Sequence, residues 1–130
     1  MAQIVRIFTA LPATPDVADY SFDPVAPFPV VRMNVEASAQ EHGGASAFAA
    51  KIIVRDVVNG VVAAPVATTG TITVAPWIIR NATLQFALPP AITAIAAAGN
   101  KVEIEGILRV GAVAGGSNID FASTLFVWAF

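Results

Sequence analysis

The ten residues KVEIEGILRV, at positions 101–110, decide the fold class of this chain. Val102, Ile104, Gly106 and Leu108 stand at every second position, and residues that are mostly charged stand between them. A period of two places alternate side chains on opposite faces of an extended backbone, so it predicts a strand with one buried face. The Gly-rich stretch that follows predicts a loop at 111–118.

Similar runs of β-branched and alternating residues occur along most of the chain, and they predict an all-β domain. Short strands separated by turn residues are typical of a β-sandwich, and we expect one of the jelly-roll type. The dipeptide Asn59-Gly60 predicts a hairpin with a type I′ turn, and a loop is expected at 41–46. One short helix is predicted near 90–98, because Pro90 suits a first helical turn and Gly99 suits its end. The expected strands are residues 3–9, 30–38, 48–58, 61–66, 70–74, 82–88, 101–110 and 120–130.

Composition limits what kind of protein this is. With 130 residues the chain is expected to form a single domain over 1–130. Hydrophobic residues make up 56% and charged residues 12%, about half the usual charged share. Such a chain is expected to cover part of its surface with copies of itself, the alternative being a monomer with a plain surface.

Charge and cysteine usage exclude several classes of partner. The net charge is −2 with only two lysines, so no nucleic-acid partner is expected. The absence of cysteine removes disulfides and thiol ligands but leaves the compartment open. We expect no signal peptide, no membrane insertion and no cofactor, and the localisation stays unknown.

The last strand brings a family resemblance. The segment NIDFAS at 118–123 continues to the pair Val127-Trp128, and it follows strand 102–110 and a loop of small residues. With the hairpin expected at 52–62, these pieces resemble the TNF-like jelly-roll domain of trimeric bacterial fucose-binding lectins. That resemblance implies a homotrimer with closing strands near the three-fold axis and a saccharide site between subunits. It transfers no binding residue, because the loop 111–116 has no arginine and the single tyrosine, Tyr20, lies outside the matched strands.

Few residues suggest catalysis or metal binding. The only histidine, His42, lies beside Glu41 in a loop and lacks a partner histidine or cysteine. Asp16, Asp19 and Asp23 match no calcium loop, and loop aspartates commonly cap turns. Glu103 and Glu105 share one strand face, which fits either acid–base chemistry on a sugar or a solvated surface. We therefore expect no enzyme and no metal site.

Trp77, Arg80 and Asn81 form the most ligand-like cluster in the sequence. A tryptophan ring can stack on the C–H face of a sugar, while an arginine and an asparagine can bond its hydroxyl groups. The alternative is that Trp77 packs in the core or at a subunit contact.

These observations predict a non-catalytic, lectin-like carbohydrate-binding module that acts as a homo-oligomer, most simply a trimer. The alternative function is structural assembly, as in a virion decoration or capsid-type jelly roll. A groove with polar and aromatic side chains would favour the lectin, and a large flat apolar face would favour assembly. The closing strand is expected at a subunit contact, so that Trp128→Asp would break assembly.

Overall fold

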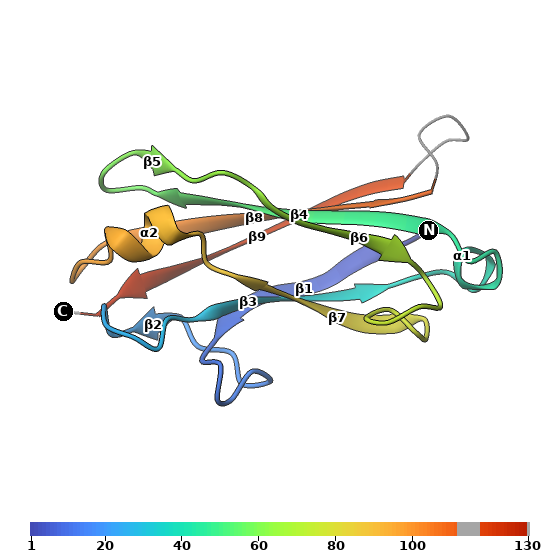
Figure 1. The fold of residues 1–130 in the computed structure, drawn as a ribbon, viewed down its shortest axis with the longest axis horizontal. Coiled ribbons are helices and arrows are strands. Elements are labelled where there is room, and N and C mark those ends of the chain that lie inside the picture. Colours follow the sequence, from blue (N-terminus) through green and yellow to red (C-terminus); the bar gives the residue numbers. More distant parts are fainter. Residues whose placement is uncertain (112–117, 130) are drawn as a thin grey trace.

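Two β-sheets pack face to face in the computed structural model, which describes residues 1–111 and 118–129 (Figure 1). The smaller sheet has the order β1 (Gln3–Ala10), β3 (Val30–Glu36), β7 (Asn81–Ala87). The larger sheet has the order β2 (Ser21–Phe22), β9 (Asn118–Trp128), β8 (Lys101–Val110), β4 (Ala47–Asp56), β5 (Val61–Val62), and β6 (Val66–Thr71) also pairs with β4. The prediction of an all-β sandwich is therefore confirmed.

The alternating pattern of β8 is realised as the sequence predicts. Val102, Ile104 and Leu108 are buried between the sheets, while Lys101 and Glu103 face outward. The predicted strands 61–66 and 70–74 were placed wrongly. The chain pairs with β4 twice along the same edge, first for two residues and then over Val66–Thr71, and Pro65 stands at the break because it cannot donate to a ladder.

The hairpin at Asn59-Gly60 exists, but its turn is not of type I′. Of the two residues only Gly60 has a positive φ, +70°, whereas type I′ requires it at both. Gly60 N donates to Asp56 O at 2.9 Å, which makes a wider turn. The buried carboxylate of Asp56 fixes that turn by accepting hydrogen bonds from Val58 N and Asn59 Nδ2, each at 2.9 Å.

Two five-residue helices lie at opposite ends of the sandwich (Figure 1). The helix α2 (Pro90–Ala94) confirms the helix predicted near 90–98, in a shorter form. The helix α1 (Ala39–Gly43) replaces part of the loop expected at 41–46. Ser38 and Glu41 form a reciprocal capping box around its first turn, a spacing that was visible in the sequence.

One cluster of buried side chains fills the space between the sheets. Trp128 is only 1% exposed and packs edge-to-face against Phe126 and Phe28, with ring centroids 4.9 and 5.7 Å apart. Trp128→Asp would therefore disrupt the core itself and cannot test whether the closing strand lies at a subunit contact, which stays a prediction. The other tryptophan, Trp77, packs against Phe48 at a centroid distance of 5.2 Å.

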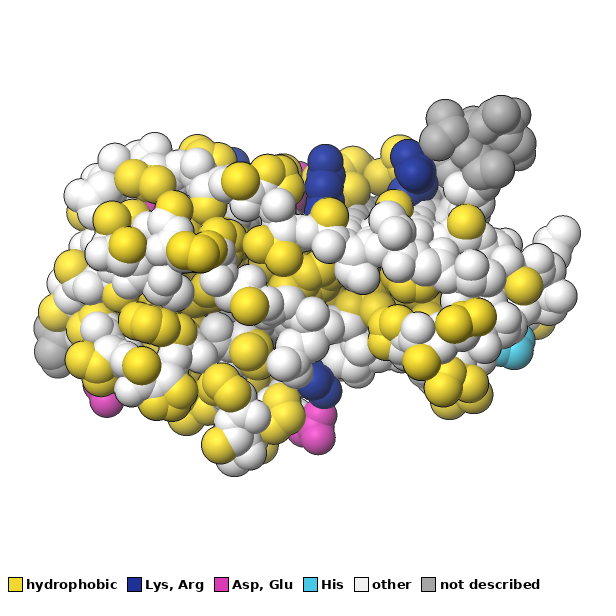
Figure 2. Space-filling model, viewed as in Figure 1, with side chains coloured by type: hydrophobic (Ala, Val, Ile, Leu, Met, Phe, Trp, Pro, Cys, Tyr) yellow, Lys and Arg dark blue, Asp and Glu magenta, His cyan; other side chains and the backbone are white. Residues whose placement is uncertain are grey.

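The surface remains rich in apolar side chains, as the composition suggests. Figure 2 shows hydrophobic side chains spread over one face of the molecule with few charged ones between them. Most of the loop predicted for residues 111–118, namely 112–117, lies outside the described residues. Within the described residues, no helix is both long enough and apolar enough to span a membrane.

Candidate functional site

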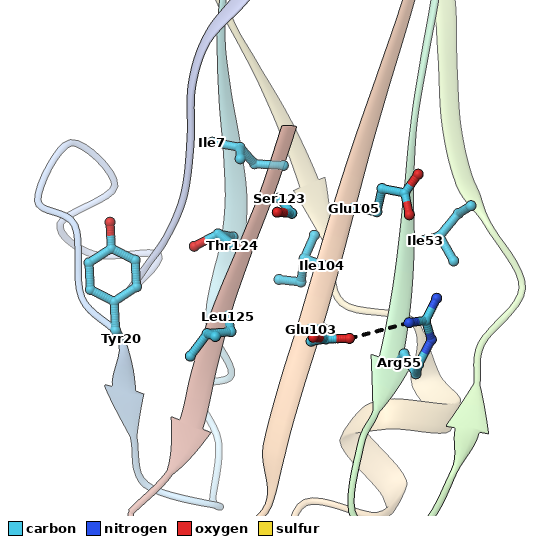
Figure 3. Close-up of a pocket in the computed structure, with 10 residues that line it drawn as sticks. All are labelled: Ile7, Tyr20, Ile53, Arg55, Glu103, Ile104, Glu105, Ser123, Thr124 and Leu125. Carbon is cyan, nitrogen blue, oxygen red and sulfur yellow. Dashed lines mark hydrogen bonds and ion pairs between the residues drawn. The ribbon is translucent and has the colours of Figure 1, made fainter. Parts of the chain in front are cut away.

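The outer face of the larger sheet carries the main concave site of the described residues. A groove of about 630 Å³ crosses β4, β8 and β9 (Figure 3). It continues past the edge of β9 to Tyr20, before β2, and to Ile7 on β1 of the smaller sheet. We call this cavity the outer groove. Its lining residues are Ile7, Tyr20, Ile53, Arg55, Glu103, Ile104, Glu105, Ser123, Thr124 and Leu125.

Strand register explains why polar groups meet there. Arg55 on β4 lies opposite Glu103 on β8, and Glu103 lies opposite Leu125 on β9. Glu105 stands two residues further, opposite Ser123, so the shared face predicted for the two glutamates is confirmed. Side chains of directly opposed residues on one face are close enough to interact.

An ion pair orders the centre of the groove. Arg55 Nη1 donates to Glu103 Oε2 at 3.2 Å, and the two side chains are about half exposed. Exposed pairs of this kind contribute at most about 1 kcal/mol to stability. The pair therefore does little for the fold, and both groups keep hydrogen-bonding capacity for a ligand.

Tyr20 contributes an exposed aromatic ring beside β9 (Figure 3). Its backbone is held on both sides, because Tyr20 N donates to Asp19 Oδ1 at 2.8 Å and Tyr20 O accepts from Val127 N at 2.9 Å. Thr9 Oγ1 also donates to Asp19 O at 2.6 Å. Sequence reasoning missed both Arg55 and Tyr20 as site residues, and only the pairing of β2 with β9 brings Tyr20 to the groove.

The sequence-predicted trio does not form a sugar-stacking site. The ring of Trp77 is fully buried, and its Nε1 donates to Arg80 O at 3.0 Å, so it cannot serve as a stacking platform in this structure. Arg80 is exposed, but its Nε donates to Ala37 O at 3.0 Å. Tight packing against Phe48 at the end of the core explains the burial of Trp77.

Asn81 remains exposed at the start of β7, away from the outer groove. It borders a second hollow of about 360 Å³ on the smaller sheet. Asn34 and Thr83 line the same hollow and are already bonded to each other, with Thr83 Oγ1 donating to Asn34 Oδ1 at 2.9 Å. The three residues are neighbours, but their side chains do not face one site: Trp77 points into the core, Arg80 is bonded to Ala37, and Asn81 borders the second hollow.

Glu41 and His42 serve the fold around α1. Burial opposes ionisation of Glu41, but hydrogen bonds from Ser38, Ala2 N and Asn118 outweigh it and lower its pKa to about 2. His42 Nε2 lies 3.0 Å from Ile78 O and must act as the donor, since a carbonyl only accepts. The two side chains are thus directed at different partners.

Two of the three aspartates, Asp16 and Asp19, are also occupied separately. Asp16 accepts from Arg32 at 2.9 Å, and Asp19 caps the turn at Tyr20 and Ser21. Among the described residues, no group of three or more acidic, histidine or cysteine side chains is arranged to hold a metal ion.

Comparison with known proteins adds no family to this picture. No family model matches the chain, and no similar curated protein was found.

Proposed function

We propose that this protein is a non-catalytic, lectin-like carbohydrate-binding protein that acts as a homo-oligomer, with the outer groove as its saccharide site. One observation carries the proposal: the groove places the exposed ring of Tyr20 in the same cavity as Arg55, Glu103, Glu105 and Ser123. A saccharide needs this combination, because its C–H faces pack on aromatic or aliphatic surface while its hydroxyl groups bond polar side chains.

The charge of the groove favours a neutral or amino sugar as the ligand. Two carboxylates and one guanidinium line it, and Arg55 is already bonded to Glu103. An acidic sugar would meet repulsion from Glu105, whereas neutral hydroxyl groups and ammonium groups can both donate to a carboxylate.

The TNF-like jelly-roll arrangement belongs to the same proposal. It is supported by the path of the chain, which changes sheet at most connections from β1 to β8. The resemblance implies three chains, whereas the strand pairing proposed in the next section implies two, and light scattering on the intact protein decides between them.

Glycan-array screening of the labelled, full-length protein tests the function, with free sugar as competitor for any signal. We expect a specific, competable signal that falls at least tenfold in Arg55→Ala and Glu105→Gln, about 1.4 kcal/mol or more of binding free energy. Arg80→Ala and Asn81→Ala are the matched controls and are expected to bind normally.

Two results would contradict the proposal. A blank array with folded protein of unchanged mass would remove the lectin function. A signal that is lost in the Arg80 and Asn81 variants, but kept in the groove variants, would move the site to the predicted loop.

A structural assembly protein is the second candidate. The observation that favours it is an apolar row on the outward face of β9, formed by Ile119, Phe121 and Leu125, which are 50%, 60% and 42% exposed. We call this row the β9 stripe. Exposed apolar surface of this kind is typical of protein–protein contacts, and assembly would persist with a blank array.

A further inference from the structure

Strand β9 has an open edge over most of its length. One edge pairs with β8 along residues 118–127, but on the other edge β2 covers only Val127 and Trp128. Val127 N donates to Tyr20 O, and Trp128 N donates to Asn100 O on the β8 side. Because backbone groups alternate in direction along a strand, the odd-numbered residues 119, 121, 123 and 125 direct their N–H and C=O groups to the open edge.

Strand β1 does not occupy that edge within the described part of the chain. Ile4 N donates to the side chain of Asp120 at 2.7 Å, and Asp120 belongs to the even-numbered, core-facing set of β9. Strand β1 therefore lies close to β9 on its inner side, but no backbone ladder joins the two strands.

Two other edges of the sandwich carry devices that discourage strand addition. Strand β1 has a bulge between Ile4 and Arg6, and the β4 edge is covered by β5 and β6, with Pro65 between them. The open edge of β9 has no proline and no lysine or arginine from 119 to 125. Proteins protect free edges with such residues because an unprotected edge pairs with another strand.

We propose that the open edge of β9 pairs with β9 of a second copy of this chain, antiparallel and about a two-fold axis at Ala122. This register is chosen by the edge itself. It sets Ile119 opposite Leu125 of the second copy and Phe121 opposite Ser123, so all four outward-directed residues find a partner. Centring the pair on Ser123 would require Val127, whose N–H is already bonded to Tyr20, and centring it on Phe121 would leave Leu125 without a partner among the described residues.

The two β9 stripes become neighbours in this arrangement. Each exposed side chain gains a cross-strand neighbour on the side that is now open, about 4.5–5.5 Å away between Cβ atoms. The small share of charged residues suggests that the chain associates with itself. The β9 stripe is the surface through which this association would occur.

Charge favours the antiparallel orientation over the parallel one. Arg109 lies beside Ile119 on the outer face, and Glu103 lies beside Leu125. In the antiparallel pair, Arg109 of one copy and Glu103 of the other lie in the same cross-strand row. Three strand spacings, roughly 14 Å, separate them. That distance exceeds the Debye length of about 8 Å at physiological ionic strength, so the attraction is largely screened and matters mainly at low salt.

The second copy also borders the outer groove, a consequence that rests on the proposed function. Phe121 of the second copy lies beside Ser123, next to Glu105 in the same row. It would add an aromatic wall of the kind that the buried Trp77 cannot supply. Mass and cross-linking test the strand pairing, whereas the array tests sugar binding, so either proposal can fail without the other.

Cysteine scanning tests the register, since the chain has no cysteine of its own. Ala122→Cys is expected to form a disulfide-linked pair on mild oxidation, because residues 122 would face each other at a Cα distance of about 4.5 Å. Ser123→Cys is the matched control and is expected to stay unlinked, because its own copy lies diagonally, beyond about 7 Å.

Charge variants test the surface in the intact protein. Light scattering is expected to give twice the 13.4 kDa of one chain. Ile119→Lys with Leu125→Lys should return it to one chain, since like charges then face each other twice. Ile119→Lys with Leu125→Glu should restore the pair, and Val25→Lys with Ile79→Lys, two exposed apolar positions elsewhere, should leave it unchanged.

Three results would overturn the inference. The first is a wild-type mass of one chain. The second is a wild-type mass of three chains, or a mass of two chains together with no cross-link in Ala122→Cys. The third is a double-lysine variant that keeps the wild-type mass while its circular dichroism shows the native fold.

Discussion

At the scale of single residues, the carboxylate of Glu41 shows how a helix of five residues is held in place. It accepts from Ser38 N at 3.0 Å and Asn118 Nδ2 at 3.3 Å, and it lies 3.5 Å from the N-terminal amine. These donors stabilise the charged form and hold the pKa at about 2, below its ordinary value of 4.5. Glu41 therefore ties the chain start, α1 and β9 together.

The lowered pKa of Glu41 predicts a loss of stability in acid. A group with a lowered folded-state pKa stabilises the fold above its unfolded pKa, and that stabilisation disappears as the pH falls from about 4.5 to about 2. Glu41→Gln should lower the free energy of unfolding by about 1–2 kcal/mol at pH 7 and much less at pH 2. Urea titrations at several pH values measure this, with Glu36→Gln as the control. Equal losses at both pH values would show that the charge of Glu41 is not what matters.

At the scale of elements, Gly106 shows how closely the two sheets approach. A Cβ at this position of β8 would lie 2.7 Å from Met33 Cε on β3 and 2.8 Å from Ile7 Cδ1 on β1. Both atoms are the ends of side chains that can turn, so one added methyl group can be accommodated with adjustment. A larger side chain would force the sheets apart.

A series at Gly106 should therefore show a graded cost. Gly106→Val is expected to lower the free energy of unfolding by about 1–3 kcal/mol, and Gly106→Ala by less, because overpacking strains a filled core. Chemical denaturation measures both variants, with Ala49→Val on the outward face of β4 as the control. A Gly106→Val variant as stable as the wild type would mean that Met33 and Ile7 leave room that the structure does not show.

The sequence predicted the longer strands well, because their periodicity is a local property, and it missed the short strand β2 and misplaced β5 and β6. The run 101–110 became β8 at both boundaries, and Pro90 marked α2. The type I′ turn predicted at Asn59-Gly60 was wrong. The buried carboxylate of Asp56, three residues before Asn59, holds a wider turn instead.

The candidate site was less predictable, because it depends on which strands become neighbours. Trp77 looked ligand-like in isolation but fills the core against Phe48. Tyr20 reaches the outer groove only because β2 pairs in parallel with the end of β9, more than 100 residues later in the chain. No local pattern encodes such a long-range pairing.

At the scale of the whole molecule, the two tryptophans stand at opposite ends of one core. Trp77 packs against Phe48, which pairs with Val110 at one end of β8, and Trp128 bonds to Asn100 just before the other end. Ten residues of strand separate these ends, which is about 30 Å. One continuous cluster of buried side chains connects them.

That continuity predicts cooperative unfolding of the chain as one unit. Trp128→Phe leaves Trp77 as the single fluorescent reporter of one end, and Trp77→Phe leaves Trp128 as the reporter of the other. Each variant loses part of a packed ring and should unfold at a lower urea concentration than the wild type. Within each variant, however, tryptophan fluorescence and far-ultraviolet circular dichroism should have the same midpoint, because a shared core leaves no end that can melt alone. A fluorescence midpoint that precedes the circular dichroism midpoint in only one variant would divide the sandwich into two units. If the early midpoint occurs in Trp77→Phe, the less stable end is the one around Trp128 and the Phe22–Phe126 contact, whose centroids are 5.5 Å apart; if it occurs in Trp128→Phe, the less stable end is the one around Trp77 and Phe48.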